Sequence, residues 1–372
     1  MQRLSSEWKV FTKSDIVQSV AAMFGGNVVV TLVGILGALI QGHFVSPEDL
    51  GHFRQFDIIS GYLFFLHLGV FHAVERLYPY FIGCGEKEKA VRVIEIANSW
   101  LLRVCIPVVL ILLMISVVYF VNSDWKSGLG IVAQAFTFFS MLYGGFLSAT
   151  YRSGQDFKNM AKAQIAGPIF SLISLPIFWF QSYLALFIKN ITQTVTLWYL
   201  YKNRPVKCNN MRFNREELVI LVKQGLPLFT ASYIMSTGLD AVRSTIILQQ
   251  LGTQQFGLWM FSWMIMMMAM QLPQMITAVF IPKIVSLYAN TNSPFACIHL
   301  ARKPILFGLL SLCVIVPVGI VAVNYIIPSI FPKYADSGVI ISILLLSLPL
   351  ILLEAPATIL NAMKWVGWLN IS

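Results

Sequence analysis

The chain has 372 residues, of which 57% are hydrophobic and only 11% are charged. Soluble domains carry about 25% charged residues, so this composition excludes a soluble protein of this length. The net charge of +10 has the sign of a nucleic-acid binder, but the basic residues are sorted by membrane side, and no nucleic-acid partner is expected. We therefore predict an all-α polytopic membrane protein.

Apolar residues gather in runs that are long enough to cross a bilayer, which takes about 20 residues per helix. The first run is too long for the apolar core of a signal peptide and is expected to remain as a helix. Arg103 interrupts the third run, and only Gln181 and Ser182 separate the fifth from the sixth. The runs predict ten transmembrane helices over 16–42, 55–82, 96–121, 129–151, 163–180, 183–201, 225–248, 256–280, 305–327 and 339–363.

The basic residues predict the orientation of these helices. With a cytoplasmic N-terminus, most of the 26 Lys and Arg lie in cytoplasmic loops, whereas Lys126 and Lys333 lie outside. Cytoplasmic loops of membrane proteins carry such an excess of positive charge. The five cysteines lie in predicted cytoplasmic loops or helices, so no disulfide framework is expected.

Two parts of the chain resemble each other at an offset of about 206 residues. Gly51 corresponds to Gly257 and Phe53 to Trp259, while Pro79 corresponds to Pro282 at an offset of 203. Six predicted helices precede the second copy, so both copies enter the membrane in the same direction. This predicts a parallel repeat with its pseudo-two-fold axis along the membrane normal.

The repeat divides the chain into two predicted lobes. Residues 1–201 form an N-terminal lobe of six transmembrane helices, and 202–223 form a basic cytoplasmic linker. Residues 224–372 form a C-terminal lobe of four helices, so we expect this copy to be truncated by two.

Catalytic and nucleotide-binding motifs are missing from the sequence. There is no Walker A loop, no His-Glu-x-x-His, no Gly-x-Ser-x-Gly and no cysteine pair with metal spacing. We expect no enzymatic activity, no cofactor and no metal. Internal repeats in a membrane protein are typical of transporters. Without a nucleotide site, we expect the energy for transport to come from an ion gradient, the membrane potential or consumption of the substrate on the far side.

Ionisable residues inside the predicted helices are the candidate site, because each costs about 3 kcal/mol in the membrane centre unless it is paired or faces a cavity. Arg54 with Asp57, and Asp240 with Arg243, are each three residues apart and can pair across one helical turn. Each pair either neutralises itself or lines a cavity. The candidate cavity residues are Arg54, Asp57, Glu75, Arg76, Arg103, Lys189, Asp240 and Arg243.

These charges do not follow the repeat. The second copy has Met260 where the first has Arg54, and the first copy has Gly37 where the second has Arg243. Charges that differ between the copies favour one shared, asymmetric cavity. Since most of the candidate charges are basic, the cavity is predicted to suit an anion.

Two segments carry a resemblance to a known family. The first runs from Leu50-Gly51 through Tyr78-Pro79-Tyr80 to Ala90, and the second includes Gly225-Leu226-Pro227, Leu239-Asp240, Phe256-Gly257 and Phe280-Ile281-Pro282-Lys283. They resemble the polysaccharide-export flippases, the Wzx-type O-antigen and capsule family of the multidrug/oligosaccharidyl-lipid/polysaccharide exporter superfamily. Asp240 matches the Leu-Asp position of that family, but Ala241 stands where an arginine often follows.

The resemblance implies a two-lobed, V-shaped bundle in the cell inner membrane. Such a flippase moves an undecaprenyl-pyrophosphate-linked oligosaccharide to the periplasmic leaflet, through a cationic lumen, for O-antigen, lipopolysaccharide or capsule synthesis. The implied partners are this lipid-linked oligosaccharide, membrane lipids and other membrane proteins of polysaccharide assembly. The alternatives are a drug or cation exporter of the same superfamily, an O-antigen polymerase or acyltransferase, and an inactive truncated fragment.

Overall fold

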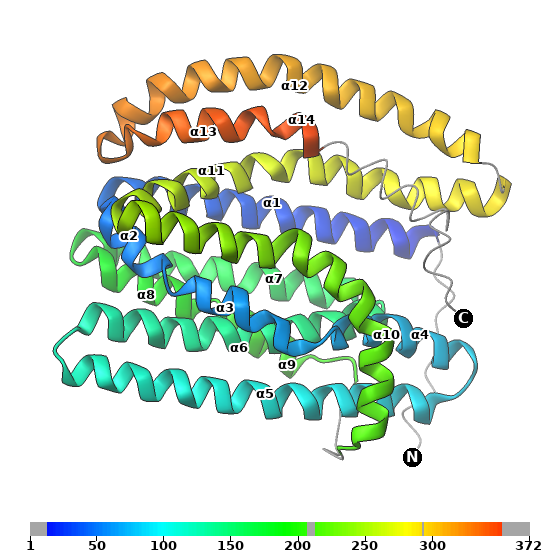
Figure 1. The fold of residues 1–372 in the computed structure, drawn as a ribbon. Helices are drawn as coiled ribbons and strands as arrows, with labels where there is room; N and C mark the ends of the chain where they lie inside the picture. The colour runs from blue at the N-terminus through cyan, green and yellow to red at the C-terminus, as the bar shows by residue number, and fades with distance from the viewer. Residues whose placement is uncertain (1–12, 207–212, 292–293, 352–372) are drawn as a thin grey trace. The chain divides into compact units, whose positions relative to one another are not determined.

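A computed structural model describes residues 13–206, 213–291 and 294–351, and these residues form helices and no strand (Figure 1). The prediction of an all-α protein is confirmed for this part of the chain. The α-helices are α1 (Lys13–Phe44), α2 (Pro47–Arg54), α3 (Asp57–Leu63), α4 (Val70–Gly83), α5 (Lys87–Val121), α6 (Trp125–Ser153), α7 (Phe157–Ser171), α8 (Ser182–Thr192), α9 (Thr194–Lys202), α10 (Arg215–Tyr233), α11 (Leu239–Thr291), α12 (Pro294–Ile330), α13 (Ser337–Leu346) and α14 (Leu348–Ile351). Short 3₁₀ or π segments are η1 (Phe64–His67), η2 (Leu172–Ser174), η3 (Pro176–Trp179), η4 (Ile234–Gly238) and η5 (Pro332–Tyr334).

Several helices are long and apolar enough to cross a membrane, so the chain is membrane-embedded. Five such spans lie in the described part of the chain: Gly25–Phe44, Lys87–Val121, Trp125–Ser153, Phe157–Trp179 and Leu312–Ile330. A sixth is possible if Pro47–His67 and Val70–Gly83, which meet at an angle of 41°, form one bent span.

The arrangement of ten helices in two lobes stays a prediction. The predicted span 183–201 is divided at Gln193 into α8 and α9, and each piece is shorter than a bilayer needs. The predicted span 339–363 begins as α13 and continues into residues outside the described part.

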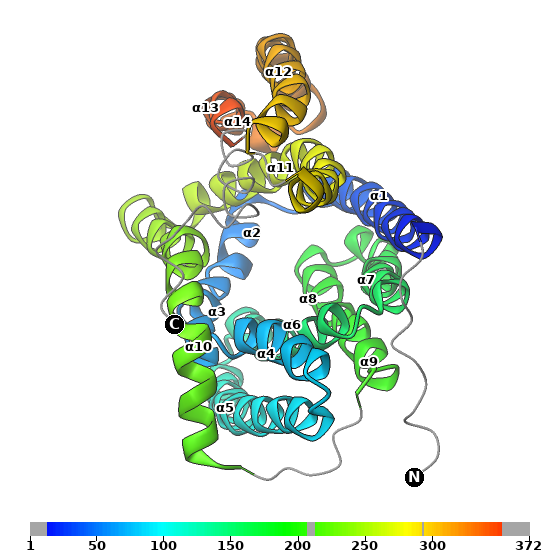
Figure 2. The ribbon, with the colours of Figure 1, turned by 90° about the vertical axis from the view of Figure 1, so that its right-hand side faces the viewer.

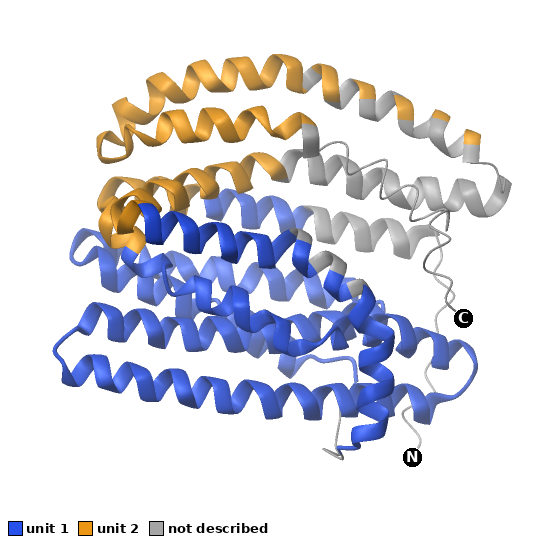
Figure 3. Ribbon diagram, in the orientation of Figure 1, with its two compact units in different colours: residues 1–34, 52–250 blue, residues 35–51, 251–372 orange. Residues whose placement is uncertain are grey.

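The helices form two compact units (Figure 3). Unit 1 contains residues 1–34 and 52–250, and unit 2 contains residues 35–51 and 251–372. Helix α11 contributes to both units, and its helical conformation is interrupted at Gly252, where φ is 80° and ψ is 177°. The predicted lobes 1–201 and 224–372 and their linker 202–223 stay a prediction.

The core of unit 1 lies between α4, α5 and α6, which pack against one another (Figures 1 and 2). Val74, Leu101 and Phe146 are fully or almost fully buried there. The buried Tyr151 hydroxyl donates a hydrogen bond of 3.0 Å to the carbonyl oxygen of Leu200 in α9. Because this hydroxyl is buried, it needs such a partner within the protein.

Unit 1 also contains a sharp bend between η1 and α4. Leu68 and Gly69 have left-handed backbone conformations, with φ of 50° and 78°. The Gly69 amide donates a hydrogen bond of 2.9 Å to Nδ1 of His67, and its Cα lies against the backbone of Gly225 in α10, where a Cβ on either residue would collide with the other. Only glycine fits both the dihedral angle and this close approach.

In unit 2, α2 crosses α11 at Gly51 and Gly257, which correspond to each other in the internal repeat of the sequence. A Cβ on Gly51 would lie 2.9 Å from the amide nitrogen of Gly257, and a Cβ on Gly257 would lie 3.0 Å from that of Gly51. The same added atoms would collide with the carbonyl oxygens of Thr253 and Pro47. The backbones are therefore in direct contact, as small residues permit between membrane helices.

An aromatic cluster around η5 completes the described part of the unit 2 core. Tyr334 is fully buried, its ring stacks on Phe261 at 4.1 Å between centroids, and its hydroxyl donates a hydrogen bond of 3.3 Å to the carbonyl oxygen of Val45. Burial and the nearby Asp49 carboxylate raise the pKa of Tyr334 above its usual value. The hydroxyl therefore stays protonated and remains a donor to Val45.

The glycine crossing in unit 2 predicts a stability effect. The Gly257→Ala substitution should destabilise the protein by about 1–3 kcal/mol, the usual cost of overpacking, because the Pro47 carbonyl oxygen occupies the space that the new methyl needs. Thermal unfolding of the purified protein in detergent measures the effect. The matched control is Gly34→Ala, because no described residue outside the local helix backbone comes within 4 Å of the Cβ position of Gly34, and its midpoint should not fall. Equal midpoints for the two variants would contradict the crossing.

Candidate functional site

Two basic side chains from distant parts of the sequence converge in unit 1. Arg54 ends α2 and pairs with Asp57, the first residue of α3, through an Nη1 to Oδ2 distance of 2.9 Å. Lys189, in α8, lies close enough to Arg54 for the two positive charges to repel each other. All three side chains are half-buried. We call Arg54, Asp57 and Lys189 the cationic cluster.

Aromatic contacts hold the cationic cluster in place. Phe56 fills the break between α2 and α3 and packs so closely on Gly130 of α6 that a Cβ there would collide with its ring. Two residues before Arg54, the His52 ring nitrogen Nδ1 lies 3.1 Å from the hydroxyl of Tyr183, the second residue of α8. That hydroxyl also donates a hydrogen bond of 2.7 Å to the carbonyl oxygen of Lys126. The ends of α2 and α8 are thus tied together.

A second ion pair follows the π-helical turn η4. Nη2 of Arg243 lies 2.6 Å from Oδ1 of Asp240, and both side chains are more than a third exposed. Next to them, the hydroxyl groups of Tyr62 and Thr245 are 3.0 Å apart. π-Helical turns are frequent at functional sites. Here η4 directly precedes α11, whose first turns contain Asp240 and Arg243.

The remaining candidates have other partners. Glu75 in α4 pairs with Arg152 in α6 at 2.5 Å, while its sequence neighbour Arg76 is exposed. Arg103 is exposed, and its guanidinium lies 4.0 Å from the centre of the Phe213 ring. The structure thus brings Arg54, Asp57 and Lys189 together, pairs Asp240 with Arg243, and gives Glu75 and Arg103 partners that are distant in the sequence.

Sequence reasoning missed a pocket of about 570 Å³ whose largely apolar lining includes several side chains with hydroxyl or amide groups. Ser140 of α6 is half-buried, and its buried hydroxyl oxygen has no hydrogen-bond partner in the described part of the chain. Thr196 accepts a hydrogen bond of 3.0 Å from the Gly167 amide. The polar residues that line this hydroxyl-lined pocket are Thr137, Ser140, Ser148, Gln193 and Thr196.

The hydroxyl-lined pocket and the cationic cluster share one helical segment. Gln193 follows Lys189 by four residues, and the backbone at Gln193 still has helical dihedral angles of −63° and −23°. Residues spaced by four on a helix lie on the same face. In the sequence, this pocket is signalled by the spacing of Thr137, Ser140 and Ser148 along one predicted helix. That spacing does not reveal which other helix packs against these side chains.

Comparisons with protein-family models, with curated proteins and with solved structures find no match to this chain. The fold and the composition define its class. It is a helical membrane protein with half-buried charges inside its helix bundle.

The cationic cluster predicts water access to Lys189. The five native cysteines are first replaced by serine, and Lys189 is then changed to cysteine. The Lys189→Cys variant should react with a charged methanethiosulfonate. The reason is that a membrane helix tolerates a half-buried charge where the side chain faces a polar cavity. The control is Val117→Cys on the exposed apolar face of α5, where 58% of Val117 is accessible. Lipid should shield that thiol and keep it from ionising.

The measurement is the rate of labelling in membrane vesicles opened to the reagent on both sides. A rate for Lys189→Cys no higher than that for Val117→Cys would mean that Lys189 faces no aqueous cavity.

Proposed function

We propose that this protein is a flippase that moves an oligosaccharide linked to undecaprenyl pyrophosphate across the cell inner membrane by alternating access. The observation that carries the proposal is that Arg54, its ion-pair partner Asp57 and Lys189 are all half-buried charged side chains in unit 1. The N-terminus is proposed to be cytoplasmic, as the distribution of basic residues predicts. The product would serve the synthesis of O-antigen, lipopolysaccharide or capsule.

The cationic cluster suits the pyrophosphate group of such a substrate. Asp57 neutralises part of the charge of Arg54, and an anion that approaches Arg54 and Lys189 would lower the repulsion that remains between them. An arginine offers a planar fork of donors to phosphate oxygens and a lysine offers a point charge. A site with both residues is well suited to a group that carries several charged oxygens.

The hydroxyl-lined pocket suits the sugar portion. Sugars present many hydroxyl groups, and the pocket offers both donors and acceptors from Thr137, Ser140, Gln193 and Thr196. Gln193, at the end of α8, lies four residues after Lys189 and lines this pocket, so the pocket is near enough along the chain to receive a sugar attached to a phosphate on Lys189.

The candidate charges favour an anion over a cationic drug. A cation exporter would need acidic groups that are free to receive its substrate, whereas Asp57 and Asp240 are each paired with an arginine at 2.9 and 2.6 Å. We therefore rank the drug or cation exporter second.

The Lys189→Gln variant tests the proposal directly. The purified protein is placed in proteoliposomes with a fluorescent undecaprenyl-pyrophosphate-linked oligosaccharide, and translocation is followed by quenching from outside. Loss of one charge-assisted hydrogen bond, about 1.5–3 kcal/mol, should reduce the initial rate by about tenfold or more at low substrate. Lys189→Arg, which keeps the charge, should retain most of the rate.

A matched control separates this effect from a general loss of positive charge. Lys89→Ala removes an exposed lysine that pairs with Glu86 at 3.0 Å and should leave the rate unchanged. The flippase proposal would be refuted if vesicles with the wild-type protein translocate the lipid no faster than protein-free vesicles. If the wild type is active and Lys189→Gln is as active as Lys189→Arg, the cationic cluster is outside the substrate path.

Disruption of the gene in the source organism provides a second test. Display of surface polysaccharide should be lost and restored by the wild-type chain, but not by Arg243→Ala or Lys189→Ala variants that reach the membrane in normal amount. Unchanged display after disruption would contradict the proposed pathway, and restoration by both variants would remove these residues from the substrate path.

A further inference from the structure

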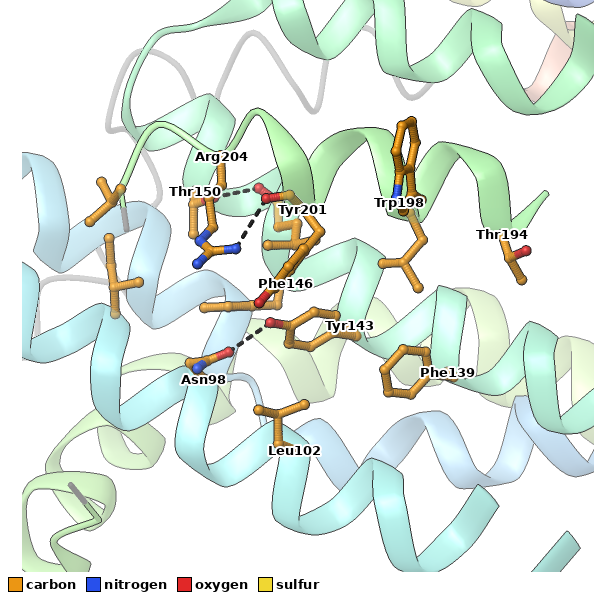
Figure 4. Close-up of a pocket in the computed structure, with 14 residues that line it drawn as sticks. Asn98, Leu102, Phe139, Tyr143, Phe146, Thr150, Thr194, Trp198, Tyr201 and Arg204 are labelled. Carbon is orange, nitrogen blue, oxygen red and sulfur yellow. Dashed lines mark hydrogen bonds between the residues drawn. The ribbon is translucent and has the colours of Figure 1, made fainter. Parts of the chain in front are cut away.

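A second pocket of unit 1, between α5, α6 and α9, has a polar end and an apolar body (Figure 4). Its volume is about 480 Å³, within the range of about 300–1,000 Å³ that ligand sites occupy. Arg204 and Asn98 lie at one end, and Phe139 and Thr194 lie at the other. The lining also includes aromatic and aliphatic side chains: Ile94, Leu102, Tyr143, Phe146, Leu197 and Trp198.

The polar end is held in a fixed arrangement. The Tyr143 hydroxyl donates a hydrogen bond of 3.0 Å to Oδ1 of Asn98. The guanidinium of Arg204 stacks on the Tyr201 ring at 4.1 Å and donates from Nη1 to the Tyr201 carbonyl oxygen at 3.1 Å. An arginine has five N–H donors, so a guanidinium positioned in this way still has donors for an incoming anion.

Exposed aromatic side chains and a lysine of α9 adjoin the pocket. Trp198 and Tyr201 are 59% and 47% exposed, and the ammonium of Lys202 lies 4.9 Å from the centre of the Trp198 ring. Amphipathic aromatic rings beside basic residues are typical of the headgroup level of a bilayer. The basic stretch 202–223 begins here, and the charge distribution predicts that this end is cytoplasmic.

We propose that this pocket binds one anionic phospholipid of the bilayer, with its phosphate on Arg204 and an acyl chain in the apolar body between α5, α6 and α9. Basic pockets between membrane helices on the cytoplasmic side bind anionic headgroups through the same combination of charge and apolar surface. Charge complementarity selects an anionic headgroup over a zwitterionic one. The site is separate from the cationic cluster, so the proposal goes beyond the flippase function and does not depend on it.

Native mass spectrometry of the purified full-length protein tests the site, with phosphatidylglycerol and phosphatidylcholine added in turn. Wild type should retain one phosphatidylglycerol per chain and bind phosphatidylcholine at least about fivefold more weakly, the factor expected for one basic residue at an anionic surface. Arg204→Ala should lose this preference. Thr194→Trp, which places a large ring at the far end of the pocket, should weaken binding of both lipids.

The matched control is Lys202→Ala, which removes a neighbouring basic residue that does not line the pocket and should bind phosphatidylglycerol like the wild type. Equal losses in Arg204→Ala and Lys202→Ala would overturn the proposal in favour of unspecific surface attraction. Wild-type binding by a folded Thr194→Trp variant would show that no chain enters the pocket. Preference for a polyprenyl phosphate over phosphatidylglycerol by more than about tenfold would assign the pocket to the transported lipid instead.

Discussion

The structure depends on one constraint, which is that lipid offers no partner to a polar group. Every charge, backbone break and hydroxyl inside the helix bundle must therefore find its partner within the protein or in a water-filled cavity. The Arg54–Asp57 and Asp240–Arg243 pairs satisfy this between residues three apart in the sequence. The Glu75–Arg152 pair satisfies it between two helices. Arg54 and Lys189 differ from these pairs, because their like charges repel each other.

Irregular backbone lies close to the charged residues of unit 1. The break between α2 and α3 separates Arg54 from Asp57, and the π-turn η4 precedes Asp240. The bend at Leu68 and Gly69 is stabilised by a hydrogen bond to His67 and by the contact with Gly225. Interrupted helices of this kind occur in transporters where a polar site must lie at membrane depth. The local geometry therefore agrees with the proposed transport function.

The two pockets of unit 1 lie on either side of the contact between α6 and α9, and Leu197 contributes to both. One is rich in hydroxyl groups and is next to Lys189 along the chain. The other is aromatic and ends at Arg204. A lipid held in the second pocket would contact the same helix that lines the first.

The sequence alone determined the class of this protein and its local pairings. Its apolar runs required membrane helices, and a spacing of three residues allowed Arg54 to reach Asp57 and Arg243 to reach Asp240, because both properties depend on neighbours along the chain. Tertiary structure decided the rest. The Lys189–Arg54 approach, the stacking of Arg103 on Phe213 and the backbone contact of Gly51 with Gly257 join residues far apart in the sequence. No periodicity encodes which helix faces which, since that follows from packing of whole helix surfaces.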